Sequence, residues 1–182
     1  MVIIFTGDGK GKTTAALGQA VRALGRGKKV LIIQFIKNCE SGEHLFFKKI
    51  QTMALAGKIK IIPAGKGFVK ILGDKLPLGE HKKAANIALK LAKKEILGGK
   101  WDLVILDEIN VAVSLKLIKA ADVLKVIRIN QRGNLYKSAR IIILTGRSAP
   151  KSFIKKADLV TEMKEIKHPF KKGAQAQIGV EF

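Results

Sequence analysis

A glycine-rich run near the N-terminus constrains the fold of this chain more than any other feature. The run TGDGKGKTT (residues 6–14) stands between an apolar segment, Val2 to Phe5, and a helical pattern from Ala15 to Leu24. This order predicts a strand, a tight turn and a helix, whose N-terminal amides can surround anionic oxygens. In the closing GKT (residues 11–13), the lysine reaches outer phosphates and the threonine hydroxyl ligates Mg²⁺. The run therefore predicts a P-loop that binds a nucleoside triphosphate.

The spacing of the glycines departs from the common P-loop pattern. Thr6 stands five residues before Gly11, where a glycine is expected, and the first glycine, Gly7, is only four residues before Gly11. The loop is therefore predicted to be tighter or differently seated. Glycine-rich turns also join strands to helices without any ligand, but the preceding strand, the following helix and the GKTT ending all favour phosphate binding.

Short apolar runs recur between helical stretches. They are continuous rather than alternating, which is typical of strands buried on both faces of a parallel sheet. The segment from Gly79 to Leu97 has an apolar face and a lysine face and is predicted to be a helix packed on that sheet. We expect a single three-layer α/β domain over residues 1–182. The predicted strands are Val2 to Phe5, Val30 to Phe35, Ile59 to Ile62, Leu103 to Leu106, Ile141 to Leu144 and, more weakly, Leu159 to Thr161.

The chain is strongly basic, with 35 Lys plus Arg against 14 Asp plus Glu and a formal charge of +21. Such a charge can indicate a nucleic-acid surface. It can equally be a solvated lysine coat, and this interpretation is favoured because the charges are spread along the chain without an arginine cluster interleaved with aromatics. Either way, the field attracts anionic substrates such as ATP.

The compartment is predicted from what the chain lacks. No apolar run approaches the roughly 20 residues that a membrane span needs. The sequence enters its first strand without a secretory leader, and a single cysteine, Cys39, cannot form an intramolecular disulfide. We therefore expect a cytoplasmic protein, in which Cys39 is incidental.

A second phosphate-site element is predicted where the fourth strand ends. WDLVILDE (residues 101–108) is a buried strand followed by two acids, Asp107 and Glu108. Ligands bind at strand ends of open parallel sheets, and an acid there completes a magnesium shell beside the P-loop threonine. Asp107 and Glu108 are therefore candidate Mg²⁺ ligands. The alternative is that they cap the following helix.

Two further segments are candidates for substrate contact. Thr145-Gly146-Arg147 follows a predicted strand and could direct a hydroxyl and a guanidinium at phosphate or ribose, although a glycine turn with a surface arginine has the same pattern. The stretch from Pro63 to Gly79 is a long loop for a compact domain, and such loops often contact substrate. The three histidines, His44, His81 and His168, form no local metal or catalytic motif and are assigned no chemistry.

Six blocks in order resemble the P-loop ATP:corrinoid adenosyltransferases, and the resemblance runs from Val2 to Phe182. The TGxGKGKTT loop is the variant that this family carries. The resemblance implies a RecA-like P-loop fold and transfer of the 5′-deoxyadenosyl group of ATP to a cob(I) corrinoid, with release of triphosphate, in coenzyme B12 biosynthesis or salvage. It also implies an electron donor for cobalt and a homodimer. The blocks are FTGDGKGKTTAALG (5–18), VLIIQFIK (30–37), WDLVILDEIN (101–110), ILTGRSAP (143–150), ADLVTEM (157–163) and KHPFKKGAQAQIGVEF (167–182).

The resemblance also implies roles for residues of this chain. ATP is bound in a sense reversed from ordinary P-loop enzymes, so that C5′ faces the corrinoid. Lys12 and Phe68 would be the catalytic residues, with Phe68 touching the corrinoid. Where some members carry Gly-Phe-Thr-Trp, this chain has Gly67-Phe68-Val69-Lys70 and lacks the second aromatic. The implied ATP-binding residues are Gly7, Asp8, Gly9, Lys10, Gly11, Lys12, Thr13, Thr14 and Arg147, and the implied Mg²⁺ ligands are Thr13, Asp107 and Glu108.

Two other functions fit the P-loop without the resemblance. One is a nucleic-acid-associated P-loop ATPase, which the charge of +21 suggests. The other is a nucleotide-binding regulator without turnover. The first predicts ATP turnover stimulated by DNA or RNA and binding that weakens steeply with salt. The second predicts ATP binding without any product.

Overall fold

The predicted alternation of strands and helices is present in the structure, a computed structural model that describes residues 1–38, 41–53, 55–71, 73–132, 141–168 and 177–179. Cys39 lies outside the described residues. The strands are β1 (Val2–Thr6), β2 (Val30–Gln34), β3 (Ile59–Pro63), β4 (Leu103–Asp107), β5 (Ile141–Thr145) and β6 (Leu159–Glu162). The helices are α1 (Lys12–Gly25), α2 (Gly42–Met53), α3 (Leu78–Leu97), α4 (Ile109–Ser114), α5 (Ala120–Arg132) and α6 (Lys151–Ile154). All the predicted strands and the helix predicted from Gly79 to Leu97 are confirmed.

The strands form one sheet in the order β3-β2-β4-β5-β1-β6, and every pairing is parallel. The carboxyl ends of neighbouring strands therefore meet at one edge of the sheet. The register brings Gln34, the last residue of β2, opposite Asp107, the last residue of β4. This edge is where an open parallel sheet binds ligands.

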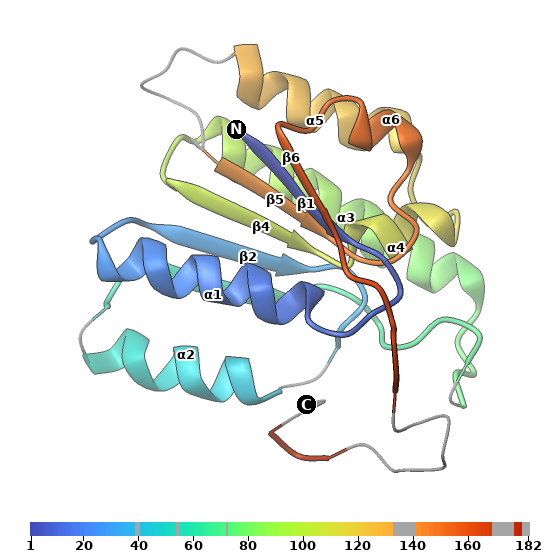
Figure 1. The fold of residues 1–182 in the computed structure, drawn as a ribbon, viewed down its shortest axis with the longest axis horizontal. Helices are drawn as coiled ribbons and strands as arrows, with labels where there is room; N and C mark the ends of the chain where they lie inside the picture. Colours follow the sequence, from blue (N-terminus) through green and yellow to red (C-terminus); the bar gives the residue numbers. More distant parts are fainter. Residues whose placement is uncertain (39–40, 54, 72, 133–140, 169–176, 180–182) are drawn as a thin grey trace.

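Apolar side chains form two cores, one on each face of the sheet, which confirms the three-layer prediction. Because successive side chains of a strand point to opposite faces, Val2 and Ile4 of β1 belong to one core while Ile3 and Phe5 belong to the other. Helices α3 and α5 cover the first core, and α1 and α2 cover the second (Figure 1).

Burial differs between the middle and the edges of the sheet. The central strands β1, β2, β4 and β5 are buried almost throughout, as predicted. The prediction is wrong for β6, in which all four residues are exposed, and for β3, in which only Ile59 is buried. Both lie at sheet edges, so each has a strand neighbour on one side only. A continuous apolar run does not reveal its place in the strand order.

Helix α1 connects the P-loop to the second core. Its buried residues Ala16, Ala20 and Leu24 recur every four positions and lie on one face. Their small or flexible side chains let the helix pack closely on the central strands, so its N-terminus is fixed at the carboxyl edge of the sheet. In α3 the predicted lysine face, including Lys83 and Lys90, is exposed.

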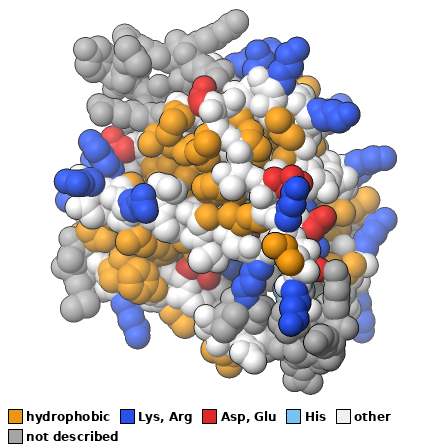
Figure 2. Space-filling model, viewed as in Figure 1, with side chains coloured by type: hydrophobic (Ala, Val, Ile, Leu, Met, Phe, Trp, Pro, Cys, Tyr) orange, Lys and Arg blue, Asp and Glu red, His pale blue; other side chains and the backbone are white. Residues whose placement is uncertain are grey.

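The surface carries its positive charge in many places. On the face shown in Figure 2, Lys and Arg side chains are scattered over the surface and along its outline rather than gathered in one patch. This distribution agrees with a solvated lysine coat. Within the described ranges, none of the helices has the length and apolar composition to cross a bilayer.

Candidate active site

The P-loop joins β1 to α1 at the carboxyl edge of the sheet. Gly11 occupies the position before the helix with φ of 111°, a conformation that side chains rarely adopt. Lys12 begins α1, and its buried Nζ donates a hydrogen bond of 2.5 Å to the carbonyl oxygen of Gly9. Burial lowers the pKa of Lys12, although the nearby Glu108 carboxylate works in the opposite direction. The lysine therefore folds back over the loop.

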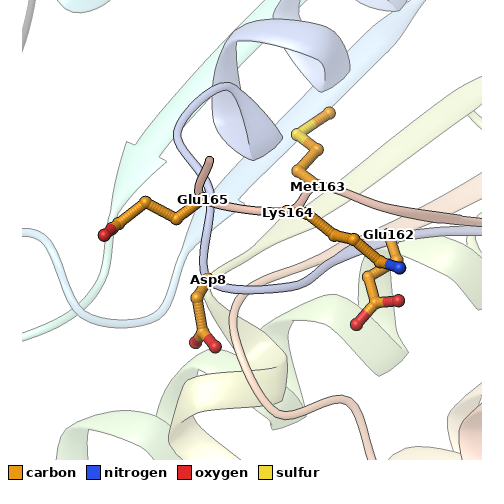
Figure 3. A pocket seen from close by; sticks show the side chains of 5 residues that line it. All are labelled: Asp8, Glu162, Met163, Lys164 and Glu165. Carbon is orange, nitrogen blue, oxygen red and sulfur yellow. The ribbon is translucent and has the colours of Figure 1, made fainter. Parts of the chain in front are cut away.

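The residues after β6 explain the first two glycines of the loop. Gly7 has φ of 94°, and a Cβ added there would lie 2.3 Å from the carbonyl oxygen of Met163. A Cβ on Gly9 would lie 2.7 Å from the carbonyl oxygen of Lys164. These distances are too short for any side chain, so the segment after β6 crosses the loop where only glycine fits. Figure 3 shows this segment, Glu162 to Glu165, passing next to the backbone of the P-loop.

Hydrogen bonds hold the same crossing together. The Gly9 amide donates to the Met163 carbonyl at 2.7 Å, and the Met163 amide donates to the Thr6 carbonyl at 2.8 Å. The Gly9 amide, predicted to hold phosphate, is thus engaged with Met163. The Met163 sulfur would lie 3.5 Å from a Cβ on Gly11. The unusual glycine spacing therefore corresponds to a tight loop that packs against the residues following β6.

A hollow of about 440 Å³ lies beside this crossing and is lined by Asp8, Glu162, Met163, Lys164 and Glu165 (Figure 3). Three carboxylates against one ammonium make it a poor site for a polyphosphate. This hollow is therefore not a candidate phosphate site.

Asp107 is the centre of a buried hydrogen-bond cluster at the end of β4. Its Oδ1 accepts bonds from the Thr13 hydroxyl at 2.8 Å and from the Thr145 hydroxyl at 2.6 Å. Its Oδ2 accepts a bond of 3.0 Å from the Gln34 amide. Asp107 therefore fixes the P-loop threonine against the sheet. The Thr145 hydroxyl, considered as a phosphate contact, instead donates to Asp107 and accepts the Glu108 amide at 2.9 Å.

Glu108 faces the other way and reaches the cavity. It precedes α4 with φ of 60° and makes no side-chain capping bond, so the alternative interpretation of these acids as helix caps does not hold for Glu108. Burial raises the pKa of Glu108 to about 7, and the neighbouring Asp107 charge adds to the effect. A carboxylate that is poorly solvated and turned to a cavity is well suited to meet a cation.

The P-loop, Glu108 and Phe68 all line one cavity of about 560 Å³. Phe68 comes from the long loop between β3 and α3 and is 56% exposed. Arg147 follows β5, and its Nη2 donates to the Asp8 carbonyl at 3.3 Å. Gly7 and Asp107 are outside the lining. The sequence-predicted residues that line the cavity are Asp8, Gly9, Lys10, Gly11, Lys12, Thr13, Thr14, Phe68, Glu108 and Arg147.

Sequence reasoning missed a group of hydrogen-bonded polar side chains that also lines the cavity. Lys37 and Glu43 line the cavity, and Lys37 Nζ lies 2.5 Å from Glu43 Oε1. Gln34 donates to Glu43 at 3.2 Å and so links this pair to Asp107. Burial works to raise the pKa of Glu43, but hydrogen bonds from Lys37 and Ser41 outweigh it and lower that pKa to about 2. Gln34 and Lys37 stand in the VLIIQFIK block of the family resemblance, and this block was the feature of the sequence that could have pointed to them.

The donor set suits magnesium rather than a softer metal. Across the described part of the chain, no group of three His, Cys, Asp or Glu side chains could hold a metal ion. The candidate ligands at the end of β4 and in the P-loop are the carboxylates of Asp107 and Glu108 and the hydroxyl of Thr13, all of which are oxygen donors. Mg²⁺ is usually bound by one or two carboxylates together with substrate phosphates and water.

A parallel sheet with a P-loop after β1 and two acids at the carboxyl end of β4 defines a P-loop NTPase-like protein of the α/β class. The fold is similar to the crystal structure of the flagellar accessory protein FlaH from Methanocaldococcus jannaschii, with a TM-score of 0.56 at 17% identity over 88% of this chain and 69% of that one. At this identity the likeness concerns the fold alone.

Sequence comparison identifies the family. The family model for ATP:corrinoid adenosyltransferase BtuR/CobO/CobP matches residues 1–182. Corrinoid adenosyltransferases of Pseudomonas aeruginosa and Escherichia coli K12 are 34% and 33% identical to the whole chain, which spans 83% and 85% of them. The corrinoid adenosyltransferase CobA of Salmonella typhimurium is 30% identical and is spanned to 85%. The chain belongs to the ATP:corrinoid adenosyltransferase family.

Membership decides between the functions left open by the sequence. The protein is a transferase that adenosylates a corrinoid with ATP, in the synthesis or salvage of coenzyme B12. A nucleic-acid-associated ATPase and a regulator without turnover are both set aside.

Proposed function

We propose that this cavity, of about 560 Å³, receives the triphosphate of ATP on the P-loop, and that the corrinoid meets the nucleotide at the side where Phe68 lies. The observation that carries this proposal is the lining itself. P-loop residues Asp8 to Thr14 form one part and Phe68, distant in sequence, forms another. ATP then lies with C5′ toward the corrinoid rather than with its γ-phosphate toward a nucleophile.

In this arrangement the reaction is a displacement at C5′. The cob(I) centre of the corrinoid attacks C5′, a cobalt–carbon bond forms, and the C5′–O bond breaks with its electron pair going to the triphosphate. The substrate supplies the nucleophile, so no protein base is needed. The protein has to align the reacting atoms and stabilise the leaving charge. Lys12 and Arg147, two of the cationic side chains that line the cavity, would stabilise this charge.

Mg²⁺ fits the site through Thr13 and Glu108. Asp107 has its oxygens occupied by Thr13, Thr145 and Gln34, so it acts by orienting the Thr13 hydroxyl. Glu108 offers a carboxylate to the cavity itself. When bound there, the ion neutralises charge on the triphosphate. This division between the two acids refines the prediction that both are ligands.

The wider setting of the enzyme follows from the family resemblance. We infer one domain over residues 1–182, a homodimer, a cytoplasmic location and a separate electron donor that reduces cobalt before transfer. Nucleic acid and membranes are not expected partners. Sedimentation of the purified protein tests the dimer.

The experiment is product analysis with ATP, Mg²⁺ and chemically reduced cobalamin. Adenosylcobalamin and inorganic triphosphate are expected in equal amounts. The β,γ-imido analogue of ATP should also react, because its β–γ link stays intact when the C5′–O bond breaks. Orthophosphate as the only product, or complete loss of reaction with the analogue, would contradict the proposal. Added DNA should leave the rate unchanged.

A further inference from the structure

A buried pair, Asp74 and His81, connects the loop that carries Phe68 to helix α3. His81 Nε2 lies 3.2 Å from Asp74 Oδ1 and 3.1 Å from Oδ2. The side chains are only 2% exposed for His81 and 6% for Asp74. An ionised carboxylate accepts hydrogen bonds and cannot donate them, so the hydrogen lies on Nε2. Neither residue lines the cavity.

Asp74 also fixes the backbone of its own loop. Its Oδ2 accepts the Lys70 amide at 2.8 Å, and its Oδ1 accepts the Leu76 amide at 3.1 Å. Lys70 has φ of 58°, an uncommon conformation for a residue other than glycine. These two amide bonds, with His81, lower the pKa of Asp74 and keep it charged. The carboxylate therefore holds a strained turn two residues after Phe68.

The other end of the loop is attached to the chain that leaves β2. The Gly65 amide donates to the Lys37 carbonyl at 2.9 Å, and the Gly67 amide donates to the Ile36 carbonyl at 2.8 Å. Next to Phe68, Val69 is 6% exposed and belongs to the core of the α3 face. Attachments on both sides thus leave Phe68 as the residue presented outward.

Phe68 cannot fix its own position, because more than half of its surface is exposed. Its place must come from the backbone of the loop. A carboxylate with little exposed surface is a costly way to gain stability, since apolar side chains of similar size often serve as well or better. Its use here is better explained by the single conformation that it selects.

We propose that Asp74 and His81 are positioning residues for the corrinoid, acting by holding the loop in the conformation that presents Phe68 to the cavity. The inference rests on the proposed function, in which Phe68 contacts the corrinoid. The inference goes beyond that function by giving a role to two residues that lie outside the cavity lining and touch neither substrate.

The test uses four variants of the full chain. Asp74→Ala removes all the carboxylate bonds, and His81→Leu removes the link to α3. His81→Gln keeps an N–H donor and should restore the link. Asp122→Ala is the matched control, because Asp122 forms an exposed pair with Lys125 on α5.

The first measurement needs no activity. Amide hydrogen exchange at residues 67–71 and 73–76 should be about 10-fold to 100-fold faster in Asp74→Ala, the scale of a lost hydrogen bond to a charged group. His81→Leu should show a smaller increase, and Asp122→Ala none. Unchanged exchange in Asp74→Ala would overturn the inference. Should Asp74→Ala not fold, Asp74→Asn, which removes the charge and keeps one acceptor oxygen, should show a smaller increase in exchange at the same residues, and unchanged exchange in it would overturn the inference.

The second measurement separates positioning from general stability. The KM for the corrinoid should rise about 10-fold in Asp74→Ala while the KM for ATP stays unchanged, as expected when one substrate loses binding. Combined with Phe68→Ala, the substitution should add little further loss. Normal transfer with both KM values unchanged would overturn only this inference. Failure of the wild-type protein to transfer an adenosyl group would overturn the proposed function and this inference with it.

Discussion

The P-loop and the Phe68 loop line the same cavity but reach it by different physical means. In the P-loop consecutive residues line the cavity, and the shape of the backbone is set by glycines at positions where Met163 and Lys164 leave no room for a side chain. In the Phe68 loop a single side chain meets the cavity, and its place depends on Asp74, His81 and the chain leaving β2.

The difference shows why one half of the site is so much easier to recognise. A backbone cradle needs glycines at fixed spacing, and this spacing is visible in a short stretch of sequence. A single side chain such as Phe68 needs only a loop backbone that holds it in place, and residues elsewhere in the chain can fix that backbone. The two loops should therefore respond differently to substitution.

The largest effect is expected from the P-loop cation. Lys12→Ala removes charge stabilisation from the leaving triphosphate, so the rate of adenosyl transfer should fall about 10² to 10³-fold, the scale for loss of one preorganised donor. Single-turnover kinetics with saturating ATP measure it. Lys90→Ala, an exposed lysine of α3, is the control. Equal rates in Lys12→Ala and wild type would remove the P-loop from the mechanism.

The next effect concerns the other loop. Phe68→Ala should lower kcat/KM for the corrinoid about 10-fold to 100-fold, corresponding to the apolar contact of one phenylalanine, and leave ATP binding unchanged. Ile71→Ala is a matched control, because Ile71 lies in the same loop, is 58% exposed and is outside the cavity lining. If both substitutions had the same effect, the specific role of Phe68 would be lost.

A third test addresses the glycine cradle through stability. Gly7→Ala should lower the free energy of unfolding by about 1–3 kcal/mol, because Cβ would overlap the Met163 carbonyl and φ is positive. Gly18→Ala is the control, since it lies in α1 with nothing within 4 Å of a Cβ. That substitution should raise stability by about 0.5–1 kcal/mol. Urea denaturation measures both, and a neutral Gly7→Ala would exclude the tight crossing.

The smallest effect concerns Glu43, which accepts hydrogen bonds from Gln34 and Lys37 at the edge of the cavity. The pKa of Glu43 is lowered from 4.5 to about 2, so its charged form favours the folded state. This stabilisation is complete above pH 4.5 and is lost as the pH falls toward 2. Over that range the wild type should lose about 1–2 kcal/mol more unfolding free energy than Glu43→Gln. Parallel pH curves for the two proteins would show that the Lys37 pair does not depend on the charge.

Sequence reasoning succeeded where a pattern is local. The central strands, the P-loop and the acids after β4 were all predicted, because apolar runs, glycine spacing and strand ends are properties of a few consecutive residues. It erred at β6, whose residues Leu159 to Glu162 are exposed at the edge of the sheet. Strand order depends on crossovers, which local composition does not specify.

Within the site, the missed residues share one property, which is that no local motif joins them to their partners. Gln34 meets Asp107 across 73 positions, and the histidines were assigned no chemistry because none stands in a local motif. His81 nevertheless lies against Asp74, seven residues away in the sequence, once α3 has begun and the loop has turned back. Such pairs become visible only in the folded chain.

The amino-acid sequence alone was enough to predict a parallel α/β sheet with a P-loop after its first strand, since the glycines, lysine and threonine of that loop stand together in one short stretch. The tertiary structure decided which acid orients Thr13 and which faces the cavity, because Asp107 and Glu108 are adjacent in sequence and differ only in their surroundings. It also decided how Phe68 is held beside the P-loop. The physical reason is that a side chain's direction and solvation are set by everything packed around it, whereas the conformation of a glycine turn is set largely by the turn itself.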